Sequence, residues 1–133
     1  MKRGRLMSRS KVFIVDDDDA FREETAEMLR QAGYAVGTAG SGSEALSRIE
    51  EERPDIIFLD FVMADNGNEL ARKLKSSAGT SDIPVILMSG RSREKIAAAL
   101  DDLSDQDIIE DFLEKPVNPL DLISAIEINI DGR

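Results

Sequence analysis

The sequence contains neither cysteine nor histidine among its 133 residues. Without cysteine, the chain forms no disulfide and offers no thiolate as a nucleophile or metal ligand. Without histidine, it lacks the usual general acid or base of neutral pH, and zinc becomes an unsuitable metal. Oxygen ligands remain, and these favour Mg²⁺ or Ca²⁺. Any metal or phosphate chemistry must therefore use carboxylates, hydroxyls and lysine or arginine.

Long hydrophobic runs are absent as well, since no apolar stretch approaches the ~20 residues of a membrane span. The first ten residues contain four basic side chains: Lys2, Arg3, Arg5 and Arg9. They contain no apolar segment and so do not form a secretory signal. We therefore predict a cytoplasmic protein with no membrane partner. Residues 1–10 are predicted to be a disordered tail, and residues 11–133 a single domain with its own core.

Positive charge is scarce relative to negative charge. The chain has 17 lysines and arginines against 27 aspartates and glutamates, which gives a formal net charge of −10. An acidic domain repels the phosphate backbone, so a direct nucleic-acid partner is not expected. The hydrophobic fraction of 41% is that of an ordinary globular protein.

Two short apolar runs end in carboxylates. Residues 56–59 lead into Asp60, and residues 11–15 lead into the four aspartates 16–19. An apolar run without polar alternation is typical of a strand buried on both faces of a parallel sheet. Asp60 alone would be read as the cap of a turn. Two such strands ending side by side would instead crowd several carboxylates together, which is costly unless a cation lies between them.

Strand and helix patterns alternate along the rest of the chain. The expected strands span residues 11–15, 34–39, 56–60, 83–88 and 111–114. This alternation predicts an α/β fold, a parallel sheet with helices on both faces. One helix is expected to begin near Ser92, and the last at an Asn118 cap, with Leu120 and Ile123 facing the core. Gly40-Ser41-Gly42 is an incomplete dinucleotide-loop pattern and is better explained as a turn.

Polar groups follow the expected strands at the edge where parallel strands end. They are Asp16, Asp17, Asp60, Ser89 and Lys115. Such a set combines an acidic metal cage, a carboxylate nucleophile, a hydroxyl donor and a cation. Phosphoryl transfer requires these parts, and a carboxylate nucleophile would give an aspartyl phosphate.

These residues lie in four motifs that resemble the receiver domain of bacterial two-component response regulators. The motifs are Val15-Asp16-Asp17-Asp18 with Arg22, Leu59-Asp60, residues 84–90, and residues 111–116 ending in Lys115-Pro116. The resemblance covers residues 11 to about 130. It implies the flavodoxin-like (βα)5 doubly wound parallel sheet with strand order 2-1-3-4-5.

The resemblance also implies a role for each acidic residue. Asp60 would accept a phosphoryl group from a histidine kinase or a histidine phosphotransfer protein. Mg²⁺ would be the cofactor, bound by Asp16, Asp17, Asp60 and the backbone carbonyl of Val62. A downstream protein target is implied, although the sequence does not identify it.

Three further residues take roles by the same resemblance. Ser89 would bond to a phosphoryl oxygen, and Lys115 would pair with the phosphoryl charge. Lys115 would also precede a cis bond to Pro116. Phe112 would be the aromatic side chain that turns inward when Ser89 moves.

The chain is therefore interpreted as a phospho-acceptor signalling switch and not as an enzyme. It would be a stoichiometric acceptor that assists its own phosphorylation and dephosphorylation. One alternative is a pseudo-receiver, a protein-interaction module without phosphoryl turnover, which would lack an acid or Lys115. Another is a Mg²⁺-dependent phosphatase, which often carries a second aspartate two residues after the nucleophile, where this chain has Val62.

Overall fold

The computed structural model describes residues 10–60, 67–90 and 111–131. These residues contain one five-stranded parallel sheet with the order β2-β1-β3-β4-β5, as predicted. Its strands are β1 (Lys11–Val15), β2 (Ala35–Ala39), β3 (Ile56–Asp60), β4 (Val85–Ser89) and β5 (Asp111–Glu114). The predicted tail, except Ser10, and the predicted helix from Ser92 lie outside the described residues.

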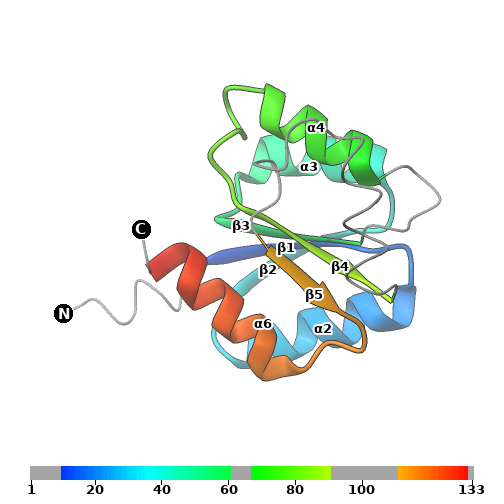
Figure 1. Cartoon of the computed structure of the whole chain (residues 1–133), viewed down its shortest axis with the longest axis vertical. Coiled ribbons are helices and arrows are strands. Elements are labelled where there is room, and N and C mark those ends of the chain that lie inside the picture. The colour runs from blue at the N-terminus through cyan, green and yellow to red at the C-terminus, as the bar shows by residue number, and fades with distance from the viewer. Residues whose placement is uncertain (1–9, 61–66, 91–110, 132–133) are drawn as a thin grey trace.

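Helices cover both faces of the sheet (Figure 1). They are α2 (Asp19–Gln31), α3 (Gly42–Glu52), α4 (Gly67–Ser76) and α6 (Pro119–Ile126), with a π-helical turn η2 (Glu127–Asp131) after α6. Helices α3 and α4 lie on one face, and α2 and α6 on the other. None of the helices in the described part of the chain combines the length and apolar character needed to cross a bilayer.

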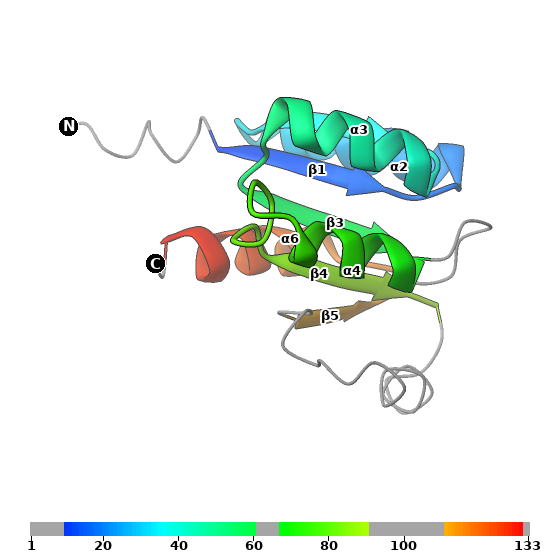
Figure 2. The same cartoon turned by 90° about the horizontal axis from the view of Figure 1, so that it is seen from above.

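The strand register fixes which residues meet at the carboxyl edge of the sheet. Strand β1 pairs with β3, and Val15 lies opposite Leu59. Each of these residues is followed by an aspartate, so Asp16 and Asp60 leave the sheet at neighbouring positions. The arrowheads in Figure 2 point in one direction, which places the carboxyl ends of the strands on one side of the molecule.

Side-chain caps set the helix starts. The Asp18 carboxylate accepts a hydrogen bond from the backbone N–H of Phe21 at 3.1 Å, and Asn118 caps α6 through Leu120 N–H at 2.8 Å. At α3, Ser41 Oγ accepts from Glu44 N–H at 3.2 Å, while Glu44 Oε1 accepts from Gly40 N–H at 3.0 Å. The pair is a variant of the capping box in which the Glu44 carboxylate accepts from the residue before the N-cap instead of from the N-cap itself. The Gly40–Gly42 turn therefore starts a helix.

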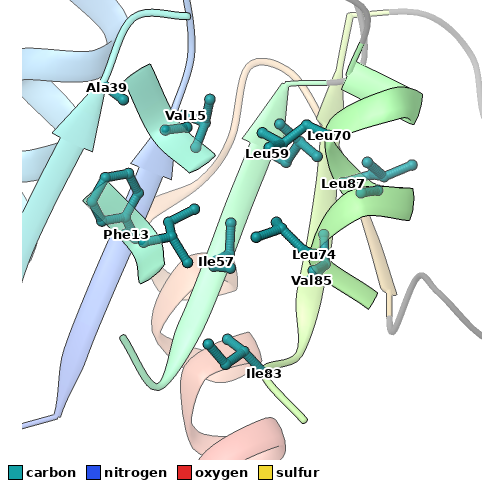
Figure 3. Packing of buried hydrophobic residues seen from close by; sticks show 13 residues of the cluster. Phe13, Val15, Ala39, Ile57, Leu59, Leu70, Leu74, Ile83, Val85 and Leu87 are labelled. Atoms are coloured by element: carbon teal, nitrogen blue, oxygen red, sulfur yellow. The ribbon is translucent and has the colours of Figure 1, made fainter. Parts of the chain in front are cut away.

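Apolar side chains alternate between the two faces of β1, β3 and β4 and form two cores. The core under α3 and α4 contains Phe13, Ile57 and Leu59 (Figure 3). The core under α2 and α6 contains Ile14 and Phe58. Every residue of β3 and β4 is buried. Their sequences therefore lack polar alternation because neither face of these strands meets water.

The core face of α6 differs from the prediction. Leu120 was expected to point inward, but 70% of it is exposed, whereas Leu122, Ala125 and Ile126 are buried. Two residues correspond to about 200° around an α-helix, so Leu120 and Leu122 lie on opposite sides. Ile123 is partly buried, as expected of a position at the border of the buried stripe.

An ion-pair cluster lies at the amino end of β1. Lys11 Nζ lies 2.6 Å from Glu52 Oε1, and Arg48 Nη2 lies 2.7 Å from Glu52 Oε2. The Arg48 guanidinium also lies 5.4 Å from the centre of the Phe13 ring. The hydrogen bond from Lys11, with help from Arg48, lowers the pKa of Glu52 below 4.5, against the opposing effect of burial. The cluster thus joins the C-terminus of α3 to the first residue of β1.

We expect this cluster to make stability depend on pH. Because the folded pKa of Glu52 lies below its unfolded value of 4.5, its contribution is present above pH 4.5 and is lost as the pH falls through the folded pKa. Glu52→Gln should lower the free energy of unfolding at pH 7 by about 1 kcal/mol. The difference from wild type should shrink by pH 3, as measured by urea denaturation.

The exposed neighbour Glu51 provides the matched control. Glu51→Gln should leave the free energy of unfolding close to that of wild type at both pH values. A Glu52→Gln penalty that is equal at pH 7 and pH 3 would contradict the assignment.

Candidate functional site

Three aspartates meet at the carboxyl edge of the sheet. Asp16 follows β1 and is fully buried, Asp60 is the last residue of β3 and is 5% exposed, and Asp17 is exposed. Each offers a carboxylate oxygen, and these oxygens all lie within 4.8 Å of one another. The structure therefore brings together the three acidic side chains that the sequence predicted at this edge.

Lys115 supplies the positive charge next to these carboxylates. Its Nζ lies 2.6 Å from Asp16 Oδ2 and 3.7 Å from Asp60 Oδ2. The second oxygen of Asp16 accepts a hydrogen bond from Asp18 N–H at 2.9 Å. A buried carboxylate is tolerated when it is paired and hydrogen-bonded, and Asp16 meets both conditions.

The backbone holds Lys115 and Ser89 at the same edge. Ser89 ends β4 and is fully buried, and its carbonyl accepts a hydrogen bond from Lys115 N–H at 2.7 Å. In the register, Asp60 lies opposite Met88, the residue before Ser89. The peptide bond between Lys115 and Pro116 is cis, as expected from the resemblance. The predicted site residues Asp60 and Ser89 thus end strands β3 and β4, and Lys115 directly follows β5.

Arg22 fixes the backbone that carries Asp16. Its Nη1 donates to the Asp16 carbonyl at 2.7 Å, and its Nη2 bonds to Asp19 Oδ1 at 2.7 Å. A Cβ at Gly40 would lie 3.1 Å from Arg22 Nη1, so this glycine leaves room for the guanidinium. Arg22 belongs to one of the four sequence motifs, but no role was predicted for it. Its position one helical turn after the aspartates was the sequence feature that could have indicated a contact with Asp16.

Phe21, whose helical spacing predicts only a place on the inward face of α2, lies beside the Lys115 ammonium. Its ring centre lies 4.3 Å from Lys115 Nζ. No local pattern indicates this contact, because the two residues lie in distant parts of the sequence. Val62 lies outside the described residues, as does the side chain of Phe112.

The donor set suits a small hard cation. Mg²⁺ prefers oxygen ligands at about 2.1 Å, so two oxygens bound to one ion lie at most about 4.2 Å apart. The carboxylate oxygens of Asp16, Asp17 and Asp60 lie within 4.8 Å of one another, and they would need only small shifts. Exposed Asp17 gives the cluster a side open to solvent. The residues present therefore fit a divalent metal ion.

The strand order and the position of the acidic cluster place the chain in the flavodoxin-like class of doubly wound α/β folds, whose sites lie at the carboxyl ends of the strands. Residues 12–127 match the family model of the response regulator receiver domain. The chain belongs to this family, whose members act in two-component signalling.

Curated relatives and solved structures agree with this assignment. The DNA-binding response regulator MtrA of Mycolicibacterium smegmatis is 28% identical over 123 residues, which make up 92% of this chain and 51% of that protein. The phosphate regulon transcriptional regulatory protein PhoB of Pseudomonas aeruginosa is 32% identical over 117 residues, or 87% of this chain and 49% of that protein. The chain thus spans about half the length of these curated relatives.

The solved structures match over nearly their full length. Chemotaxis protein CheY4 of Vibrio cholerae has a TM-score of 0.77 and 28% identity, covering 90% of this chain and 97% of that chain. A CheY-like response regulator receiver domain protein of Methanospirillum hungatei has a TM-score of 0.80 and 26% identity, covering 93% and 95%.

Removing the Lys115 ammonium should destabilise the fold through Asp16. Lys115→Met leaves a buried carboxylate without its cation, and we expect the free energy of unfolding to fall by about 1–3 kcal/mol. Adding Asp16→Asn should recover part of that loss, because the uncompensated charge is then gone. Urea denaturation of both single variants and the double variant measures this coupling.

Lys73 is the matched control, because its side chain is 57% exposed and its Nζ lies 3.9 Å from Glu69 Oε2. Lys73→Met should cost less than about 0.5 kcal/mol. Strictly additive losses in Lys115→Met and Asp16→Asn would show that this pair does not stabilise the fold.

Proposed function

We propose that Asp60 accepts a phosphoryl group from the phosphohistidine of a histidine kinase or a phosphotransfer protein. One observation carries this proposal: three carboxylates lie within 4.8 Å of one another, with the Lys115 ammonium beside two of them. A carboxylate oxygen of Asp60 attacks phosphorus, and an O–P bond forms. The P–N bond to the donor imidazole breaks, and the imidazole leaves with the electron pair.

The surroundings of the three acids favour Asp60 as the acceptor. Both carboxylate oxygens of Asp16 are engaged at short range, one by Lys115 and one by Asp18 N–H. Asp17 is exposed, so its charge is the best solvated of the three. Asp60 ends the fully buried strand β3, and its Oδ2 lies 3.7 Å from Lys115 Nζ. A phosphoryl group on Asp60 would therefore arrive next to a cation that needs to move only slightly.

Two protein groups would hold the transferred phosphoryl oxygens. Lys115 contributes a charged donor, held through its backbone N–H by the Ser89 carbonyl. Ser89 contributes its hydroxyl from the end of β4, on the strand next to Asp60. Donors fixed before the reaction favour the charge that develops during transfer, because they need little rearrangement.

Asp16, Asp17 and Asp60 would hold Mg²⁺, and the backbone carbonyl of Val62 is proposed as a fourth ligand. When bound, the ion supplies charge neutralisation for the phosphoryl oxygens and for the crowded carboxylates. The residues of the chain do the remaining work. Arg22 fixes the Asp16 backbone, and Lys115 compensates for the charge on Asp16 and Asp60.

The chain would be a stoichiometric phospho-acceptor, a signalling switch that assists its own phosphorylation and dephosphorylation. Phosphorylation adds nearly two negative charges at the edge formed by β1, β3 and β4, and the segments after those strands would respond to that charge. The partners proposed for it are a phosphohistidine donor and a downstream protein target. The DNA binding named for the mycobacterial relative belongs to a protein about twice as long.

Asp60→Asn should abolish phosphorylation while the fold is kept. Incubation with acetyl phosphate and Mg²⁺ should add about 80 Da to the wild-type chain, the mass of a metaphosphate unit. Intact-mass and peptide mass spectrometry should place the adduct on Asp60. The variant should be no less stable than wild type, because one of three crowded carboxylates is removed.

Asp121→Asn is the matched control, an exposed aspartate in the first turn of α6. It should acquire the adduct as the wild type does. Labelling of Asp60→Asn at the wild-type rate would contradict the assignment of Asp60.

Mg²⁺ should raise the melting temperature through the acidic cluster. A ligand at one hundred times its Kd stabilises the folded state by about 2.7 kcal/mol. Asp17→Ala should remove most of this gain, and Glu24→Ala, a change on the exposed face of α2, should keep it. Differential scanning fluorimetry over a Mg²⁺ series measures both. An equal rise in melting temperature in Asp17→Ala and wild type would show that Asp17 does not bind the metal.

A further inference from the structure

The Lys115 ammonium has a third neighbour besides the two carboxylates. The Phe21 ring centre lies 4.3 Å from Lys115 Nζ, whereas Asp16 Oδ2 lies at 2.6 Å and Asp60 Oδ2 at 3.7 Å. A cation within about 6 Å of an aromatic ring centre is attracted by the negative face of the ring. The Lys115 side chain is 21% exposed, so water competes only in part for this ammonium. The ring is therefore positioned to hold the cation over the site.

We propose that Phe21 is a positioning residue for phosphoryl transfer, which holds the Lys115 ammonium between Asp16 and Asp60 through a cation–π contact. This inference rests on the proposed function of the site. Phe21 does not touch the reacting atoms and acts through Lys115. A core role alone would require only the volume of the side chain, and the proposal requires its aromatic face.

A ring suits this position better than a further acid. The ammonium must leave the short contact with Asp16 Oδ2 and approach an oxygen added on Asp60. An additional carboxylate would hold it at one point and would add to the repulsion among three acids. The ring attracts the cation over its whole face and carries no net charge. Lys115 can therefore move between Asp16 and Asp60 and remain in contact with Phe21.

The ring itself is held from two sides. Phe21 N–H donates to Asp18 Oδ1 at 3.1 Å, which fixes its place in the first turn of α2. Its side chain packs against the core formed by α2, α6 and the sheet. The following residue, Arg22, bonds to the Asp16 carbonyl at 2.7 Å. One helical turn thus aligns the Asp16 backbone with the Lys115 side chain.

The contact has a spectroscopic signature that volume alone does not produce. Protons above an aromatic ring are shifted upfield by the ring current. In the unphosphorylated wild-type protein without Mg²⁺, the ε-methylene protons of Lys115 should resonate upfield of those of exposed lysines such as Lys73. Phe21→Leu should remove this shift, and Phe21→Tyr should restore it. A wild-type Lys115 resonance at the position of the exposed lysines would overturn the proposal.

Kinetics with acetyl phosphate test the functional part. The rate of phosphorylation in Phe21→Leu should fall about three- to tenfold, the range expected for one partly exposed cation–π contact. Phe21→Tyr should recover the wild-type rate. If Phe21→Leu does not fold, Phe21→Met keeps an unbranched apolar side chain and gives the same comparison with Phe21→Tyr. A non-aromatic variant at the wild-type rate, or a tyrosine variant as slow as it, would overturn the proposal.

Tyr34 supplies the control for a purely structural effect. It packs against the same core but lies three residues after the last residue of α2, and Tyr34 N–H bonds to the Leu29 carbonyl at 3.1 Å. Tyr34→Leu should lower stability without slowing phosphorylation. Equal slowing in Tyr34→Leu and Phe21→Leu would attribute the effect to stability and overturn the proposal. Failure of the wild type to acquire the adduct on Asp60 would instead reject the proposed function itself.

Discussion

The charge balance at the carboxyl edge of the sheet is the constraint on which the rest of the site depends. The order β2-β1-β3-β4-β5 places β1 beside β3, so the carboxylates of Asp16 and Asp60 lie close together at the carboxyl edge. Two carboxylates in a largely buried place are costly unless a cation lies close to both. Lys115 meets this need from the far side of β4, which makes the edge strand β5 part of the site.

The backbone positions the site, and the side chains give it charge. Arg22 bonds to the main-chain carbonyl of Asp16, and the Ser89 carbonyl bonds to the main-chain N–H of Lys115. Neither contact uses the carboxylate of Asp16 or the ammonium of Lys115. The charged atoms can therefore change partners while the strand ends that carry them stay in place. A switch requires this separation, because the added phosphoryl charge must change the side-chain contacts without unfolding the strand ends that carry them.

The sequence predicted most of the frame, because its signals are local. The apolar runs of β3 and β4 reveal burial on both faces, and the aspartates after β1 and β3 mark the edge of the site. The core face of α6 was predicted wrongly at Leu120. Apolar residues lie on two sides of this helix, and only its packing against the sheet determines which side is buried. Contacts such as Phe21 with Lys115 have no local signature, since they exist only after β5 joins the sheet.

The hydrogen bond from Lys115 Nζ to Asp16 Oδ2 joins residues 99 positions apart in the chain. It therefore has a consequence for synthesis. Until residue 115 has been made, the growing polypeptide carries Asp16 and Asp60 without the lysine that compensates for their charge. Contacts between residues so far apart form late, because a long loop must close first. The site is thus complete only after the segment that ends in Lys115 has joined the sheet, and a chain terminated before that residue would carry the acids without their lysine.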